Sequence, residues 1–208
     1  MSRKCYLIAC ALMALVLGAS SAHATLVALM SFDDTVKAST YVVKGTVTAK
    51  EPGWIVDGAA RVPVTRYTLT IDTAYLGEDA PTSLTLTNPG GVQLSPELYA
   101  PMPEGFIDYP IGTTMAVMLS PTGKGTYAPA GLHQGIYYVT RDKATGAVSF
   151  ERAAGTATVV NHKAAPAQPL FAKTVYTEAE FEQALSAAAK ASGKSLRAIR
   201  KPVAGGAK

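Results

Sequence analysis

The stretch from Thr65 to Tyr75, TRYTLTIDTAY, decides the fold class because apolar and polar residues alternate along it. Successive side chains of a β-strand point to opposite faces of the sheet, so this alternation is typical of a strand with one buried face. We expect the buried face to hold Tyr67, Leu69, Ile71 and Tyr75. We expect the other face to hold Arg66, Thr68, Thr70 and Asp72.

The segments on either side of this strand predict a meander of three strands. Asp57-Gly58 is a hairpin-turn sequence, and it lies between the apolar segments 54–56 and 61–62. The segment Tyr41 to Thr48 is rich in the β-branched and aromatic residues that favour strands. A third strand is predicted over Ser83 to Thr87. Further along the chain, strand patterns occur at Thr113–Leu119, Gly135–Thr140, Ala147–Glu151 and, more briefly, Thr156–Val160.

Two helices are predicted, one before and one after the strands. Ser31 to Asp34 has the Ser-x-x-Asp spacing of a helix start, with acids in the first turn, and the helix should end near Ser39. Thr177 to Glu180 forms a capping box. The residues after it have one apolar stripe, which predicts an amphipathic helix that closes over an open part of the sheet. The stripe consists of Phe181, Leu185 and Ala188.

The first 24 residues have the pattern of a cleaved export signal. The basic pair Arg3-Lys4 precedes an apolar run from Tyr6 to Gly18, and the small residues Ala22 and Ala24 then mark a cleavage site before Thr25. A helix that spans a bilayer needs about 20 apolar residues, and this run is shorter. The pattern therefore predicts a periplasmic or extracellular protein with no transmembrane segment in its mature chain.

The composition of the mature chain excludes several kinds of site. Cys5 and Cys10 leave with the signal, so the mature chain cannot contain a disulfide, a thiol nucleophile or a cysteine metal site. Loss of Arg3 and Lys4 reduces the formal charge from +4 to +2, which does not predict nucleic-acid binding. Neither remaining histidine lies in a metal-spacing motif, and no cofactor is expected.

The segment from Asn88 to Gly112 differs from the rest because it contains five prolines. Proline excludes a central strand or a helix interior, and a long excursion inside a compact domain is often functional. Large aromatic side chains lie in this segment, and Trp54 lies beside the hairpin turn. Our first hypothesis is a non-catalytic module that binds a protein or a glycan through loops at one end of the fold. The aromatic candidates are Trp54, Tyr99, Phe106 and Tyr109.

Two other hypotheses remain open. His133 and Gln134 lie between two glycines just before a predicted strand, so a hydrolase could combine His133 with acids of the 88–112 segment. Without such chemistry, His133 and Gln134 join the candidate binding residues. The third hypothesis is an envelope-associated structural protein that makes weak contacts with anionic surfaces through its basic C-terminus. The basic residues concerned are Lys190, Lys194, Arg197, Arg200, Lys201 and Lys208.

The following features succeed one another along the chain: the short acidic helix, residues 39–47, the alternating strand, Asn88–Gly91, residues 112–119 and Gly131–Gly135. This order resembles that of a family of uncharacterised exported bacterial β proteins. It is also similar in outline to the five-stranded barrel of netrin-like and tissue-inhibitor-of-metalloproteinase modules, an OB-type fold. Those inhibitors present an N-terminal cysteine to the protease zinc, whereas this mature chain begins at Thr25. The resemblance implies a mainly β protein, with a small OB-like antiparallel barrel or sandwich. Its expected parts are a signal over 1–24, a barrel domain with a connector over 25–172, a helical segment over 173–200 and a basic tail over 201–208.

Overall fold

The computed structural model describes residues 26–77, 79–96, 98–123, 126–154, 158–160 and 174–196. The predicted export signal with Ala22 and Ala24, most of the predicted connector between Arg152 and Lys173, and the basic tail lie outside the described residues.

The protein is mainly β, as predicted, with a large mixed sheet, a short helix near the N-terminus and a C-terminal helix. The strands are β1 (Leu26–Ala28), β2 (Tyr41–Asp57), β3 (Ala60–Leu76), β4 (Ser83–Pro89), β5 (Val92–Ser95), β6 (Leu98–Ala100), β7 (Thr114–Gly123), β8 (Thr126–Pro129), β9 (Ile136–Arg141), β10 (Val148–Arg152), β11 (Thr158–Val160) and β12 (Val175–Thr177). The helices are α2 (Phe32–Ala38), the single 3₁₀ turn η1 (Leu132–Gly135) and α3 (Glu178–Ala191).

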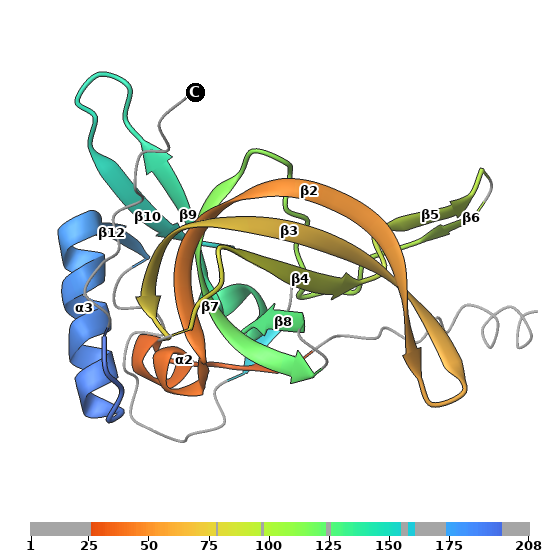
Figure 1. Ribbon diagram of the computed structural model, residues 1–208, viewed down its shortest axis with the longest axis horizontal. Coiled ribbons are helices and arrows are strands. Elements are labelled where there is room, and N and C mark those ends of the chain that lie inside the picture. Colours follow the sequence, from red (N-terminus) through yellow and green to blue (C-terminus); the bar gives the residue numbers. More distant parts are fainter. Residues whose placement is uncertain are drawn as a thin grey trace, which may run out of the picture.

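The large sheet has the order β12-β10-β9-β7-β2-β3-β4-β8, and β8 also pairs with β7. The pairings therefore run from β7 through β2, β3, β4 and β8 and return to β7, which matches the strong curvature of β2 and β3 (Figure 1). All pairings in this sheet are antiparallel except β4 with β8, which meet in parallel at one residue pair, Leu86 and Tyr127. The predicted barrel stays a prediction, since this contact is so short.

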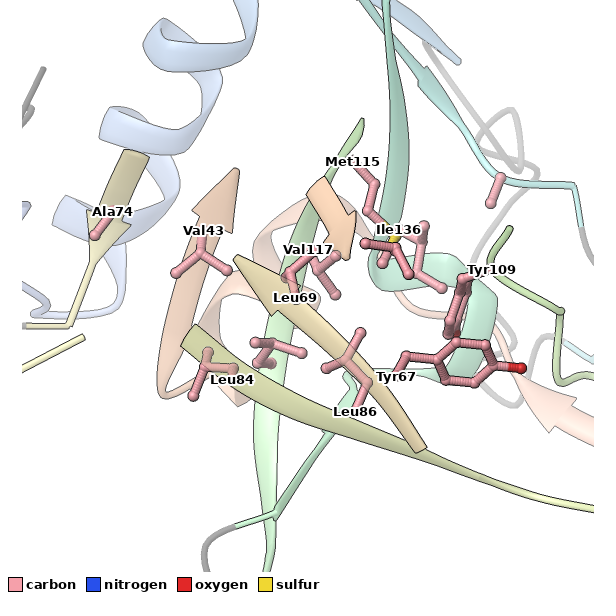
Figure 2. Close-up of a cluster of buried hydrophobic side chains, with 13 residues drawn as sticks. Val43, Tyr67, Leu69, Ala74, Leu84, Leu86, Tyr109, Met115, Val117 and Ile136 are labelled. Carbon is pink, nitrogen blue, oxygen red and sulfur yellow. The ribbon is translucent and has the colours of Figure 1, made fainter. Parts of the chain in front are cut away.

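The curved sheet is buried on both faces where β7 crosses it. Alternate residues of this strand belong to two apolar clusters, an inner core and an outer core, which explains why the segment reads as a continuous apolar run. Figure 2 shows the inner core. The inner core comprises Val43, Val47, Tyr67, Leu69, Ala74, Leu84, Leu86, Tyr109, Met115, Val117, Leu119, Ile136 and Ala153. The outer core comprises Val36, Val42, Tyr75, Leu76, Ala116, Met118, Tyr137, Phe150, Phe181, Leu185, Ala188 and Ala189.

The helices cover the outer core, and both begin where the sequence predicts. The Ser31 hydroxyl accepts a hydrogen bond from the Asp34 amide, and Thr177 and Glu180 form the reciprocal capping box. The predicted stripe of α3 is buried, with Phe181 fully so. Phe181 stacks on Phe150 with ring centroids 4.5 Å apart. The C-terminal helix thus contributes its apolar face to the sheet, as the pattern predicted.

One detail of the alternating strand differs from the prediction. Tyr75 lies in the outer core, whereas Tyr67 and Leu69 lie in the inner core. The register of β3 against β2 skips Asp72 and Tyr75, so each forms a bulge and the alternation shifts there. Gly45 lies opposite this irregular stretch, and a Cβ at that position would come within 2.3 Å of the Thr70 carbonyl oxygen.

Candidate functional site

Two hairpin ribbons project from the curved sheet at the end of the molecule opposite α3 (Figure 1). The long ribbon is the distal half of β2 and β3, from Ala49 to Thr68, and Gly58 in its turn has the positive φ of +58° that favours glycine. The short ribbon is β5 and β6, which pair with each other in a separate sheet. The hairpin turn at Asp57-Gly58 is therefore confirmed. The short ribbon was not predicted within the proline-rich segment.

The ribbons hold most of the exposed large apolar side chains of the described residues. Trp54 is 43% exposed and Tyr99 is 55% exposed, and both were predicted as binding residues. The two ribbons add three aliphatic side chains of the same kind: Ile55, Val56 and Leu98. The remaining members of this group lie elsewhere: Ile111 and Val175. Such a concentration on two projecting elements is typical of an interaction surface.

The surroundings of Trp54 hold its backbone in place and block the outer edge of β2. The Arg61 guanidinium lies over the indole ring, 5.0 Å from its centroid. The Arg66 Nη2 donates a hydrogen bond of 2.8 Å to the Trp54 carbonyl oxygen. Pro52, two residues earlier, has no N–H to offer. A strand added to this edge would therefore find no N–H at Pro52 and an occupied acceptor at Trp54, which disfavours pairing at these two residues.

A groove of about 270 Å³ separates the two ribbons. Pro52 and Thr65, which are paired across the long ribbon, both line it, and Trp54 shares their face because it lies two residues beyond Pro52. On the short ribbon, Gln93 lines the groove and lies directly opposite Tyr99, so these two side chains also share a face. Trp54 and Tyr99 are not among the lining residues, but each shares a strand face with one of them, Pro52 and Gln93 respectively. The lining of the groove consists of Lys50, Glu51, Pro52, Thr65, Gly91, Val92 and Gln93.

One lining residue of this groove, Lys50, forms an ion pair. Lys50 Nζ lies 2.7 Å from Asp108 Oδ2, and the Tyr67 hydroxyl donates a hydrogen bond of 2.6 Å to Asp108 Oδ1. Partial burial opposes ionisation of Asp108, but the hydrogen bonds from Lys50 and Tyr67 outweigh it, so the pKa of this carboxyl is lowered. Burial and the same carboxylate raise the pKa of Tyr67. Asp108 is thus an ionised acceptor whose side chain is half exposed.

A second hollow of about 600 Å³ lies beyond Asp108, where β9 runs past the start of β7. Tyr138 is half-buried in its wall, and burial together with the Asp108 charge raises the Tyr138 pKa. The other groups that line this hollow are mainly threonine hydroxyls and backbone atoms. The lining consists of Asp108, Pro110, Gly112, Thr113, Thr114, Tyr138, Val139 and Thr140.

Two predicted aromatic residues lie away from the exposed surface. Tyr109 is 2% exposed, and its ring packs against Tyr67 at 4.8 Å between centroids (Figure 2). Phe106 is partly buried. Asn88 Nδ2 donates to the Ile107 carbonyl and so ties the same loop to β4. This part of the 88–112 segment is therefore pinned against the inner core, and Tyr109 acts as a core residue.

His133 and Gln134 are also buried, in η1. The Gln134 side chain accepts from the Met30 amide and donates to the Ala28 carbonyl, both at 2.9 Å, so it anchors the chain before α2. Burial lowers the pKa of His133, a hydrogen bond with the Gly105 backbone opposes that shift, and the nearby Arg152 charge adds to it. His133 Nδ1 has no partner among the described residues. These contacts give both residues structural roles.

The described residues contain no group of three or more histidine, cysteine or acidic residues placed to hold a metal ion. No helix in the described part of the chain is long and apolar enough to cross a membrane. Of the acids of the predicted hydrolase, Asp108 pairs with Lys50, Glu104 lies on the surface and Glu97 lies outside the described residues. Lys194 of the basic C-terminus donates hydrogen bonds to the carbonyls of Val36 and Lys37, at the end of α2.

Sequence reasoning proposed Trp54 and Tyr99 as binding residues, which stays a prediction. It included Asp108 only among the acids of the 88–112 segment and did not single out Lys50 or Gln93. Lys50 and Asp108 lie 58 positions apart, and a solitary lysine and a loop acid carry no local signal that predicts their pairing. A comparison with protein-family models, with curated proteins and with solved structures finds no match to this chain, so the netrin-like resemblance stays a prediction.

Proposed function

We propose that this protein is an exported, non-catalytic binding module that holds an extended partner, a protein or a glycan, between its two ribbons. The observation that carries the proposal is the position of Trp54 and Tyr99. Both are exposed, they lie on two different projecting ribbons, and each shares a strand face with a residue that lines the groove. Tryptophan, tyrosine and arginine are the residues most enriched where binding energy concentrates, and Arg61 already orients the indole.

The architecture also supports binding over catalysis. The ribbons extend from a sheet that is buried on both faces, so their positions are fixed by the two cores while their side chains stay accessible. Export is the proposal that follows from residues 1–24, and it places the partner outside the cytoplasm.

The test is affinity capture with the mature protein, residues 25–208, from extracts of its own source. Capture is compared for the wild type, the double variant Trp54→Ala/Tyr99→Ala and the control Val175→Ala. Val175 is a suitable control because it is 46% exposed but lies on β12, beside α3 and away from the ribbons. We expect the wild type and the control to retain the same partner and the double variant to lose it. Equal capture by all three proteins would contradict the proposal.

A further inference from the structure

The groove between the ribbons and the hollow beside β9 meet at one pair of side chains. Lys50 lines the groove, Asp108 lines the hollow, and their charged atoms are 2.7 Å apart. The two depressions are therefore consecutive parts of one surface feature, which we call the trough. It runs from Pro52 and Gln93, whose strand faces also carry Trp54 and Tyr99, past the ion pair to Tyr138.

The chemistry of the trough is that of a surface for polyhydroxylated ligands. Tyr138 lies in its lining, and Trp54 and Tyr99 are exposed rings on the strand faces that border the groove. Such rings can pack against the C–H faces of sugar rings. Hydroxyl, amide and carboxylate groups lie between the rings and can exchange hydrogen bonds with sugar hydroxyls. These polar groups belong to Glu51, Thr65, Gln93, Asp108, Thr113, Thr114 and Thr140.

The charges in the lining indicate a neutral ligand. Lys50 is the basic side chain among the lining residues, where it is already paired with Asp108, and Arg61 lies against the Trp54 ring. Glu51 leaves the lining slightly acidic. A polyanion such as a nucleic acid needs several basic groups to replace its counterions, and this surface does not supply them.

The length of the trough indicates a chain of sugars. Lys50 and Trp54 are four residues apart on β2, which corresponds to roughly 13 Å along a strand at about 3.3 Å per residue. This part alone is longer than one sugar ring, and the hollow lies beyond it. Asp108 is at the centre, and its carboxylate accepts from Lys50, Tyr67 and the Tyr109 backbone, which leaves one lone-pair site for a further donor.

We propose that the trough binds a neutral linear polysaccharide, with sugar rings against Trp54 and Tyr99 and a sugar hydroxyl donating to the Asp108 carboxylate. This inference rests on the proposed function, because it names the class of partner held between the ribbons.

The test is affinity electrophoresis of the mature protein in native gels that contain neutral glucans, mannans, galactans or xylans, or an anionic polysaccharide. The variants are Asp108→Asn, Thr113→Val and Trp54→Ala/Tyr99→Ala, with Val175→Ala as control, and circular dichroism checks the fold of each. We expect retardation in at least one neutral polysaccharide and no retardation of the double variant. Asp108→Asn should bind about tenfold more weakly, since it replaces a charge-assisted hydrogen bond by a neutral one. Thr113→Val should lose a smaller factor and Val175→Ala none.

Three results would overturn the inference. In the first, no neutral polysaccharide retards the protein, while capture of a protein partner still depends on Trp54 and Tyr99. This result would leave the proposed function intact. The second is retardation only in the anionic polysaccharide that disappears with added salt. In the third, Asp108→Asn and the double variant are both folded and are retarded as strongly as the wild type. If neither polysaccharide binding nor partner capture depends on Trp54 and Tyr99, the proposed function fails as well.

Discussion

The helix end and the ribbon end of the molecule both hold aromatic side chains but use them differently. We define the helix end as α2, α3 and the sheet face beneath them, and the ribbon end as the long and short ribbons. At the helix end, Phe181 is fully buried and contacts five other rings: Phe32, Tyr75, Tyr137, Phe150 and Tyr176. At the ribbon end, Trp54 is exposed and is covered on one face by Arg61.

The fold therefore requires the aromatic residues of the helix end, whereas those of the ribbon end remain exposed and available for contact. Burial of a large apolar side chain stabilises the fold by about 1.5–3 kcal/mol, which the exposed ribbon residues largely forgo. Mutations at the two ends should therefore separate cleanly into effects on stability and effects on binding.

The largest loss of stability is expected for Phe181→Ala. Removing a buried ring from a cluster of aromatic contacts costs about 3–5 kcal/mol, because the surrounding rings cannot fill the cavity. The free energy of unfolding, measured with urea, should fall by that amount. Phe181→Leu, which keeps most of the apolar volume, should lose much less. A decrease below about 1 kcal/mol for Phe181→Ala would mean that α3 is not the cover of the outer core.

The next largest loss of stability is expected for Tyr109→Ala, about 3 kcal/mol in the free energy of unfolding. This variant tests whether Tyr109 is a core residue or belongs to the ribbon end. Tyr109 belongs to the proline-rich segment that also forms the short ribbon, yet its ring is buried against Tyr67. Tyr109→Phe is the matched control, since it keeps the ring and should retain most of the stability. Unchanged stability of Tyr109→Ala in thermal melting would place this residue with the ribbon end.

Thr177→Ala should cost about 1 kcal/mol, because the variant loses the side chain that caps α3. Thr177→Ser is the control, since its hydroxyl can accept the same hydrogen bond from the Glu180 amide. Thermal unfolding of the two variants compares them directly. An equal loss in both would assign the effect to the Thr177 methyl group.

His133 should make stability depend on pH. Burial lowers its pKa below the ordinary 6.5, so between the folded pKa and 6.5 the unfolded chain binds more protons than the folded protein. The free energy of unfolding should therefore be highest above pH 6.5 and fall as the pH decreases through this window. His133→Gln keeps an N–H for the Gly105 carbonyl and should flatten this part of the profile. The same slope in wild type and variant would assign it to other groups.

The elements that depend on local sequence were predictable. The helix starts at Ser31 and Thr177 are capping sequences, and the alternation of apolar and polar residues around Leu69 predicts the strand that contains it. The mainly β class follows from such local patterns. The extension of β2 through Glu51-Pro52-Gly53 was not predicted, since these residues disfavour strands and are held extended by their pairing with β3.

The candidate site was predictable only in part, because exposure is a property of the tertiary structure. Tyr99 and Tyr109 lie ten positions apart in one proline-rich segment, and nothing in their local sequence separates them. Tyr99 is exposed because its ribbon leaves the sheet, whereas Tyr109 is buried because Asp108 and Asn88 tie its loop to the inner core. The Lys50–Asp108 pair follows from the same folding of the loop.

The smallest effect on stability is expected for Trp54→Ala/Tyr99→Ala, within about 0.5 kcal/mol per substitution, since both side chains are exposed and little packing is lost. Partner capture should nevertheless be lost, because the same exposure makes these rings available for contact. Arg61→Ala adds a finer test, since it removes the cation over the indole and should weaken capture without lowering the melting temperature. A large drop in melting temperature for either variant would show that the ribbon end, like the helix end, uses its aromatic residues to fold.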